Sequence, residues 1–175
     1  MNYLVIVDVQ NDFVTGSLGT KEAEEMLPTL LKKVENFDGT ILLTKDSHTE
    51  QYLMTQEGKN LPVSHCVIGT NGWEFPTELE EALRGKEVKV YQKPGFGSFD
   101  LVEDLKKWYE EGKVESVELV GICTDICVVS NALLIKSALT ELPILVDASC
   151  CAGVTKEKHL KALDVMESCQ IKVVR

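Results

Sequence analysis

Six short apolar runs, rich in β-branched residues, recur along the chain, and amphipathic stretches separate most of them. Continuous runs of this kind are typical of strands that are covered on both faces in a parallel sheet. The predicted strands are Tyr3 to Val9, Thr40 to Thr44, Val88 to Tyr91, Ser116 to Val120, Pro143 to Val146 and Ile171 to Val174. The predicted helices are Glu22 to Asn36, Asp100 to Glu111, Thr124 to Leu139 and Lys156 to Ser168.

This alternation of strands and helices restricts the topology. Right-handed crossovers then connect parallel strands and place helices on both faces of one sheet. We predict a doubly wound α/β fold of three layers, with a mostly parallel six-stranded sheet. The length of 175 residues suits a single domain that spans residues 1–175. In such folds ligands bind beyond the C-terminal ends of the strands.

Composition and charge exclude several classes of partner. The formal net charge of -10 and the scattered basic residues would repel a phosphate backbone, so no nucleic acid partner is expected. The apolar segment from Met1 to Gln10 lacks a basic flank and is interrupted by Asp8, unlike a signal peptide or a membrane span. We therefore expect a cytoplasmic protein with no membrane partner, whose six cysteines are thiols rather than disulfides.

Three reactive side chains stand where predicted strands end. Asp8 closes the first strand, Lys93 follows the third, and Cys127 falls in the first turn of the helix after the fourth. We expect them to meet, because the C-terminal ends of parallel strands share one edge of the sheet. Free amides and the positive end of the helix dipole predict a lowered pKa for Cys127 and donors for an oxyanion.

Each of these residues also has a plainer interpretation. Asp8 can anchor a loop through backbone hydrogen bonds, and Lys93 can be a solvated lysine at a strand end. Most lone cysteines are small buried residues, and the pattern predicts that role for Cys66, Cys150, Cys151 and Cys169. The convergence of three such residues at three strand ends favours a nucleophile, an acid and an ammonium acting together.

The polar excursion from Lys45 to Trp73 is too long for a simple connection and is a candidate functional loop. Its carboxylates and imidazoles suit zinc, manganese or iron better than calcium or magnesium. We predict one divalent metal ion there, held at an open site. The candidate ligands are Asp46, His48, Glu57 and His65. His159, in the last predicted helix, is expected to be a surface or hydrogen-bonded residue.

Five ordered segments together resemble the isochorismatase-like cysteine hydrolase superfamily, and within it the nicotinamidase/pyrazinamidase branch. The similarity covers nearly the whole chain. The segments are Val7 to Phe13, Asp46 to His48, His65 to Thr70, Lys93 with Ser98 and Phe99, and Gly121 to Val128.

The resemblance implies roles for particular residues. The catalytic triad of the family falls on Asp8, Lys93 and Cys127, and its non-proline cis peptide bond falls between Ile122 and Cys123. The N–H groups of Cys123 and Cys127 would then form the oxyanion hole. The implied metal ligands are Asp46, His48, Glu57 and His65. The implied substrate-binding residues are Ile122 and Phe13, the latter as the stacking partner, because the aromatic residue that commonly precedes the final histidine is replaced around Leu61 to Ser64.

The implied function is a metal-containing amidohydrolase that converts nicotinamide, and pyrazinamide as well, to the acid and ammonia through a cysteine thioester. Zinc is the expected metal, with manganese or iron as the alternatives. The implied partner is a small amide, and by analogy with the family a homo-oligomer is a further option. Two other interpretations stay open. One is a related cysteine hydrolase for another small amide or a vinyl ether, and the other is a metal-binding or thiol-redox regulator that uses Cys123, Cys127, Cys150 and Cys151.

Overall fold

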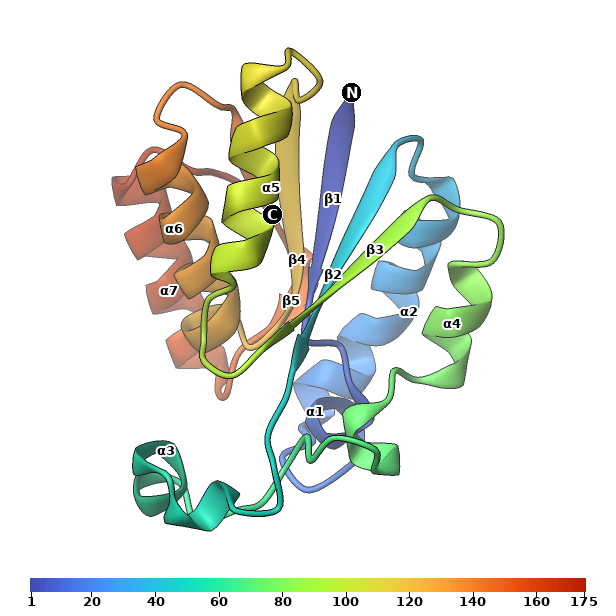
Figure 1. The fold of residues 1–175 in the computed structure, drawn as a ribbon, viewed down its shortest axis with the longest axis vertical. Coiled ribbons are helices and arrows are strands. Elements are labelled where there is room, and N and C mark those ends of the chain that lie inside the picture. The colour runs from blue at the N-terminus through green and yellow to red at the C-terminus, as the bar shows by residue number, and fades with distance from the viewer.

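A computed structural model describes all 175 residues and contains one six-stranded sheet with helices on both faces (Figure 1). All neighbouring strands are parallel, and their order is β3-β2-β1-β4-β5-β6. The strands are β1 (Asn2–Val7), β2 (Thr40–Asp46), β3 (Val88–Lys93), β4 (Ser116–Ile122), β5 (Ile144–Ala152) and β6 (Lys172–Val174). The predicted doubly wound α/β fold is confirmed.

Helices on the two faces of the sheet enclose two separate hydrophobic clusters. One face is covered by α1 (Asn11–Val14), α2 (Lys21–Asn36) and α4 (Thr77–Ala82). The other is covered by α5 (Phe99–Glu110), α6 (Val129–Ala138) and α7 (Lys156–Ser168). Strand β1 contributes alternate side chains to both clusters, which is why its sequence is apolar without interruption. None of these helices combines the length and the apolar character needed to cross a membrane.

The excursion between β2 and α4 carries its own short elements. They are the 3-10 helices η1 (Tyr52–Met54) and η2 (Asn71–Trp73) and the helix α3 (Gln56–Asn60). An isolated bridge between His48 and Val67 closes the excursion near its base, and Figure 1 shows α3 projecting beyond the C-terminal edge of the sheet. Asp46 is the last residue of β2 and so lies on the sheet itself.

The strand order reverses between β1 and β4, which both lie at the centre of the sheet. This is the switch point at which doubly wound folds bind ligands. Gly121 in β4 has a φ of 120°, and a Cβ atom there would lie 2.2 Å from the Val7 carbonyl oxygen. Only glycine therefore allows β4 to run this close to β1, and the ends of the two strands emerge side by side.

All six cysteines are free thiols. Cys66, Cys150 and Cys151 are buried, as predicted. The expectation of burial is wrong for Cys169, which is exposed. Cys169 caps the C-terminus of α7, and the next residue, Gln170, turns the chain with a φ of 65°, so the side chain is left at the surface.

A half-buried ion cluster ties α2 to the sheet, remote from the strand ends. Lys33 Nζ lies 2.6 Å from Glu118 Oε1 and 2.8 Å from Asp147 Oδ2. Burial alone would raise the pKa of Asp147, but the hydrogen bonds from Lys33 and Ser149 and the charge of Lys33 together outweigh burial and lower that pKa. A depressed pKa in the folded state stabilises the protein above the unfolded value, and this contribution is lost as the pH falls through the folded value.

We expect Lys33→Met to lower the free energy of unfolding near pH 7 by about 2 kcal/mol, because two partly buried carboxylates lose their counter-ion. The difference should persist near pH 5.5 and begin to shrink near pH 3, below the ordinary aspartate pKa of about 3.9. Urea unfolding at the three pH values measures it. Lys32→Met, at an exposed neighbouring position, should change stability little. A deficit equally large near pH 3 would contradict this account.

Candidate active site

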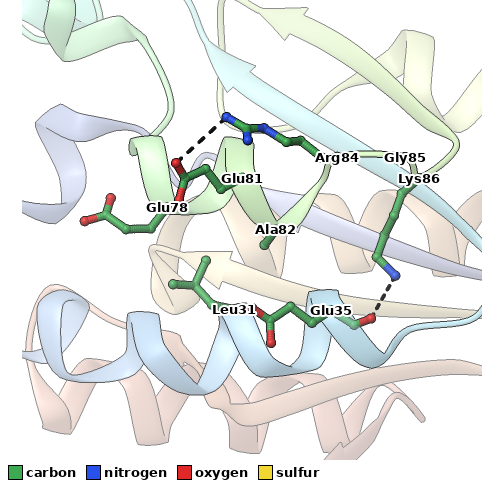
Figure 2. A pocket seen from close by; sticks show the side chains of 8 residues that line it. All are labelled: Leu31, Glu35, Glu78, Glu81, Ala82, Arg84, Gly85 and Lys86. Carbon is green, nitrogen blue, oxygen red and sulfur yellow. Dashed lines mark hydrogen bonds and ion pairs between the residues drawn. The ribbon is translucent and has the colours of Figure 1, made fainter.

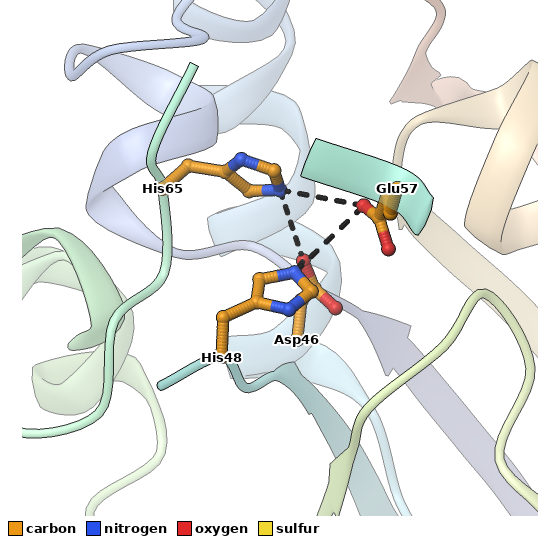
Figure 3. A group of neighbouring side chains, drawn as sticks. All are labelled: Asp46, His48, Glu57 and His65. Atoms are coloured by element: carbon orange, nitrogen blue, oxygen red, sulfur yellow. Dashed lines mark hydrogen bonds and ion pairs between the residues drawn. The ribbon is translucent and has the colours of Figure 1, made fainter. Parts of the chain in front are cut away.

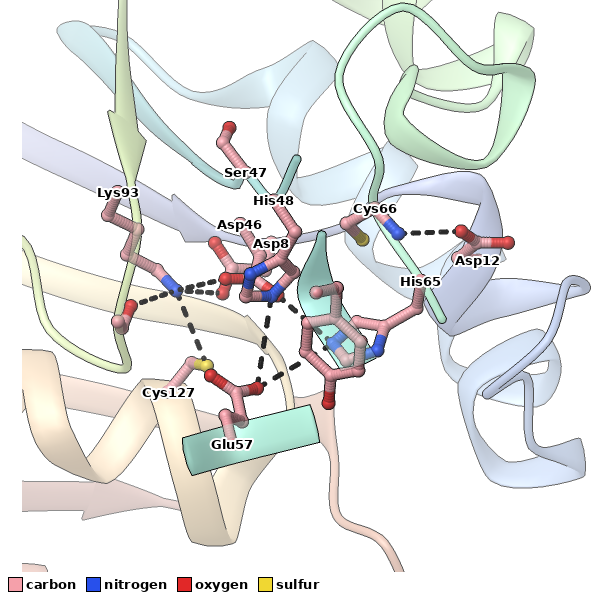
Figure 4. A network of polar contacts seen from close by, with 12 residues as sticks. Asp8, Asp12, Asp46, Ser47, His48, Glu57, His65, Cys66, Lys93 and Cys127 are labelled. Atoms are coloured by element: carbon pink, nitrogen blue, oxygen red, sulfur yellow. Dashed lines mark hydrogen bonds and ion pairs between the residues drawn. The ribbon is translucent and has the colours of Figure 1, made fainter. Parts of the chain in front are cut away.

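Asp8, Lys93 and Cys127 converge at the C-terminal edge of the sheet (Figure 4). Lys93 Nζ lies 2.6 Å from Asp8 Oδ2 and 3.5 Å from Cys127 Sγ. The same ammonium donates to the Gly95 carbonyl at 2.9 Å. Asp8 is fully buried and Lys93 is 2% exposed, so the interpretation of Lys93 as a solvated lysine is wrong. The predicted meeting of the three groups is confirmed.

Only one oxygen of the Asp8 carboxylate accepts a hydrogen bond, and the other is held in an ion pair. Oδ1 accepts a hydrogen bond of 2.6 Å from the Thr44 hydroxyl, and Oδ2 faces the Lys93 ammonium. The backbone of Asp8 has a φ of 50°, a left-handed conformation that is uncommon outside glycine and that turns the chain sharply at the end of β1. Backbone outliers of this kind often occur at functional sites.

Burial and charge set the protonation of the three groups. Burial raises the pKa of Asp8, although the positive charge of Lys93 opposes the effect. For Lys93 burial favours the neutral amine, but the negative charges of Asp8, Cys127 and Asp46 together outweigh burial and hold the pKa above the ordinary lysine value. Lys93 is therefore an ammonium, and Asp8 has an increased affinity for a proton.

The pKa of Cys127 is raised, and the prediction of a lowered value is wrong. Burial of the thiol disfavours a thiolate most, the nearby charge of Asp8 adds to this effect, and the positive charge of Lys93 offsets the two only in part. The segment Thr124–Val128 is also a π-helical turn, with α6 starting only at Val129. The structure thus places a protonated thiol against a carboxylate that can take its proton.

The peptide bond between Ile122 and Cys123 is cis, as the resemblance implied. The Cys123 carbonyl accepts hydrogen bonds from the N–H groups of Ile126 and Val128. No hydrogen bond within the chain engages the N–H of Cys123, which lies between β4 and the π-helical turn. This N–H is therefore available to a bound molecule.

Four potential metal ligands form a compact cluster next to Lys93 (Figure 3). The ligand atoms of Asp46, His48, Glu57 and His65 all lie within 4.8 Å of one another. Asp46 Oδ2 is 2.9 Å from His48 Nε2 and 3.3 Å from His65 Nε2, and Glu57 Oε1 is 3.8 Å from each of these nitrogens. Two imidazole nitrogens and two carboxylate oxygens at this spacing fit a zinc-like ion.

The surroundings of the cluster orient its members for such an ion. His65 Nδ1 lies 2.8 Å from the Val63 carbonyl, which can only accept, so the proton resides on Nδ1 and Nε2 is left as a ligand. Burial would raise the pKa of Asp46, but the neighbouring imidazoles of His48 and His65 and the positive charge of Lys93 together hold that pKa well below its usual value. The ring of Tyr52 packs against both imidazoles at centroid distances of 4.7 and 4.8 Å.

A cavity of about 280 Å³ joins the nucleophile to the metal cluster. Asp46, Glu57 and His65 line one part of it, and Cys123 and Cys127 line another. The remaining walls are mostly apolar and come from Phe13, Leu18, Thr20, Leu61, Phe96, Ile126, Val154 and Lys158. A small flat amide could therefore contact both the thiol and a metal ion within one enclosure.

A wider groove between α2 and α4 lies apart from this chemistry (Figure 2). Glu78, Glu81 and Arg84 line it, and Lys86 donates to the Glu35 carbonyl across it. It is shallow and solvated, and it holds no nucleophile. Its ion pair between Glu81 and Arg84, at 3.8 Å, is of the exposed kind that contributes little to stability.

The family model described as the isochorismatase domain matches residues 2–175. The chain belongs to the isochorismatase family. Among its curated relatives is the nicotinamidase/pyrazinamidase of Mycobacterium tuberculosis, which is 28% identical over 187 residues covering 99% of this chain and 98% of the relative. The nicotinamidase of Schizosaccharomyces pombe is also 28% identical, over 98% of this chain and 91% of the relative.

Solved structures of the isochorismatase family share the whole fold. The nicotinamidase/pyrazinamidase PncA from Bacillus subtilis has a TM-score of 0.86 and 25% identity, with 99% of each chain covered. The pyrazinamidase of Pyrococcus horikoshii, solved in complex with zinc, has a TM-score of 0.79 and 25% identity over 99% of this chain and 98% of that one. The predicted resemblance to the nicotinamidase branch is confirmed.

Of the two predicted substrate-binding residues, one lines the cavity of this isochorismatase fold and the other does not. Phe13 lines the cavity, and its ring centroid lies 5.5 Å from that of His65, while its role as a stacking partner of the substrate stays a prediction. Ile122 is buried in the core and is not among the residues that line the cavity. The wall residues Phe96 and Leu61 were not predicted from the sequence, although Phe96 lies shortly after Lys93 and Leu61 shortly after Glu57. His159 hydrogen-bonds Thr124 at 2.7 Å, in line with its predicted ordinary role.

Proposed function

We propose that this protein is a metal-dependent amidohydrolase that converts nicotinamide, and also pyrazinamide, to the corresponding acid and ammonia. One observation carries the proposal: Cys127, which contacts the ion pair of Lys93 and Asp8, lines the same small cavity as three of the four potential metal ligands, Asp46, Glu57 and His65. The relatives named nicotinamidase support the choice of substrate. The free thiols agree with a reducing cytosolic setting.

Cys127 is the nucleophile of the proposed reaction. Asp8 accepts the thiol proton while the sulfur forms a bond to the carboxamide carbon, and Lys93 stabilises the negative charge that the pair acquires. The raised pKa of Cys127 prevents the thiolate from forming ahead of time in the buried site. Asp8 must therefore take up the thiol proton before the bond from sulfur to carbon is complete.

The oxyanion that forms on the carboxamide is stabilised by backbone N–H groups of Cys123 and Cys127, each contributing about 3 kcal/mol in comparable sites. Asp8 then returns its proton to the leaving nitrogen, the C–N bond breaks, and ammonia departs from a thioester on Cys127. Water attacks the thioester with Asp8 again as the base. The sulfur leaves, recovers the proton from Asp8, and the free acid is released.

Asp46, His48, Glu57 and His65 would hold a divalent ion, zinc in our proposal. When bound, the ion supplies a Lewis-acidic coordination position for the ring nitrogen of the substrate. The protein residues do the rest of the positioning. Phe13 packs against the ring and the apolar cavity walls exclude water, so that the carboxamide faces Cys127.

Two alternatives are weaker on the same geometry. A family member that hydrolyses another small amide or a vinyl ether has no evident use for four ligands that point to one spot. A thiol-redox regulator needs accessible sulfurs, but Cys127, Cys150 and Cys151 are at most 6% exposed. Such a regulator would also leave the buried pair of Asp8 and Lys93 without a purpose.

Ammonia release tests substrate and reaction class together. We expect the purified protein to contain about one divalent metal ion per chain and to release ammonia from nicotinamide. Benzamide, which has the same shape but no ring nitrogen, should be hydrolysed at least about 100-fold less efficiently, because it loses the metal contact that orients the amide. Equal rates on the two amides, or activity in protein shown to be free of metal, would refute the proposed orientation.

A further inference from the structure

We propose that two buried carboxamides, Gln10 and Asn131, are positioning residues, each for one half of the site. Gln10 positions the carboxylate Asp46 in the metal cluster, and Asn131 positions the turn that carries Cys127. The inference rests on the proposed function, because it takes Asp46 as a metal ligand and Cys127 as the nucleophile. Neither carboxamide lines the cavity, so neither contacts the substrate directly.

The Gln10 carboxamide binds both backbone polar groups of Asp46, the N–H and the carbonyl. Its Oε1 accepts from the Asp46 N–H at 2.8 Å, and its Nε2 donates to the Asp46 carbonyl at 2.9 Å. Gln10 is fully buried, so water cannot replace these bonds. It also stands two residues after Asp8, which links the end of β1 to the end of β2.

A third hydrogen bond extends this grip to the far end of the excursion. Gln10 Nε2 donates to the Trp73 carbonyl at 2.9 Å, and the Trp73 indole N–H donates to Ser47 Oγ at 2.8 Å. The Lys45 ammonium lies 3.4 Å from the centre of the Trp73 ring. The residues before and after Asp46 are thus both fixed, and the direction of its side chain follows from this.

Asn131 makes a similar set of bonds in the other half of the site. Its Nδ2 donates to the Cys127 carbonyl at 2.8 Å and to the Phe96 carbonyl at 3.2 Å, and its Oδ1 accepts from the Ser98 N–H at 2.9 Å. It is fully buried as well. Asn131 therefore joins the turn of Cys127 to the loop that follows Lys93, and so sets the distance between sulfur and ammonium.

The chemistry of the amide explains why these two positions are not charged or apolar. Each side chain donates two hydrogen bonds and accepts one, and among neutral side chains only a carboxamide offers two N–H donors on one atom together with an acceptor oxygen. A methionine or leucine of similar volume would fill the space but break the three hydrogen bonds to backbone groups at each position. The two halves of the site should then fail separately.

Gln10→Met and Asn131→Leu test the separation in the full-length protein with two readouts that use no substrate. One is the Kd for zinc, measured by competition with a chromophoric chelator. The other is the rate of alkylation of Cys127 by iodoacetamide against pH, followed by peptide mass spectrometry on metal-free protein. Val34→Ala is the matched control, since Val34 is fully buried in the last turn of α2, near the opposite edge of the sheet.

We expect Gln10→Met to raise the Kd for zinc by about 10- to 100-fold, the usual effect of losing a partner of a metal ligand, with Cys127 alkylation within about twofold of wild type. Asn131→Leu should shift the pH midpoint of alkylation upward, while the Kd for zinc stays within about twofold of the wild-type value. On substrate, the same variant should lower kcat by about 100-fold with little change in KM, as a small misplacement of the nucleophile does. Val34→Ala should lower Tm and move neither readout.

Three results would overturn the proposal. The first two are wild-type protein that binds no zinc and a Gln10→Met variant with the wild-type Kd for zinc. The third is that Gln10→Met and Asn131→Leu each lose both zinc affinity and Cys127 reactivity in proportion to their loss of Tm. The Kd for zinc and the rate of alkylation do not depend on turnover. These two readouts therefore test the separation whether or not nicotinamide is hydrolysed. Failure of the ammonia assay with an intact separation would count against the proposed substrate alone.

Discussion

Cys127→Ala is expected to lower kcat for nicotinamide by about 10⁵-fold or more, because covalent catalysis loses its nucleophile and only binding contributions remain. Metal content should be unchanged, since no metal ligand is touched. Ammonia release and elemental analysis on the same preparation measure both effects. The combination matters, because a variant that merely misfolds would lose its metal as well.

Cys151→Ala is the matched control for this variant. Cys151 has the same 6% exposure as Cys127 and belongs to the same hydrophobic cluster, but it lies in β5 and does not line the cavity. We expect activity close to that of the wild type. Full activity in Cys127→Ala would end the thioester scheme, whichever substrate is used.

Asp8→Asn should lower kcat by about 10³-fold, within the range that a positioned general base contributes. The amide keeps the shape of the carboxylate but cannot accept the thiol proton, and it leaves the Lys93 ammonium with only Asp46 Oδ1, at 3.6 Å, as a nearby carboxylate. Alkylation of Cys127 near pH 7 should slow as well. Steady-state kinetics on nicotinamide and the alkylation rate are the two measurements.

A second aspartate that pairs with a lysine provides the control for Asp8→Asn, because its replacement should affect stability and not catalysis. Asp147 is 8% exposed and pairs with Lys33 away from the site. Asp147→Asn should lower Tm yet leave kcat per folded molecule near the wild-type value. If Asp8→Asn and Asp147→Asn reduce kcat to the same extent, Asp8 has no special role as a base.

Much of the framework could be predicted from local pattern. Each of the six strands is an apolar run, and the register of a parallel sheet then brings its C-terminal ends to one edge. Asp8, Lys93 and Cys127 follow from this rule without any knowledge of side-chain contacts. The short helices α1 and α4 were missed, because four and six residues carry too little periodicity to detect.

Features set by distant parts of the chain could not be predicted. The pKa of Cys127 depends on burial and on Asp8, more than a hundred positions earlier. The helix terminus is only the local part of its surroundings, so the direction predicted from it alone is wrong. Gln10 and Asn131 look like ordinary polar residues in the sequence, and only the fold shows which backbone groups they bind.

The placement of the four proposed metal ligands has a consequence for how a catalyst of the proposed kind can diversify. Three of the four, His48, Glu57 and His65, belong to the excursion between β2 and α4, whereas Asp8, Lys93 and Cys127 stand on or directly after elements of the central sheet. We therefore expect that the excursion can be exchanged, shortened or rebuilt for a substrate with a different ring, while Asp8, Lys93 and Cys127 keep their positions. Grafting residues 47 to 72 from a metal-free relative should redirect substrate choice before it damages the chemistry.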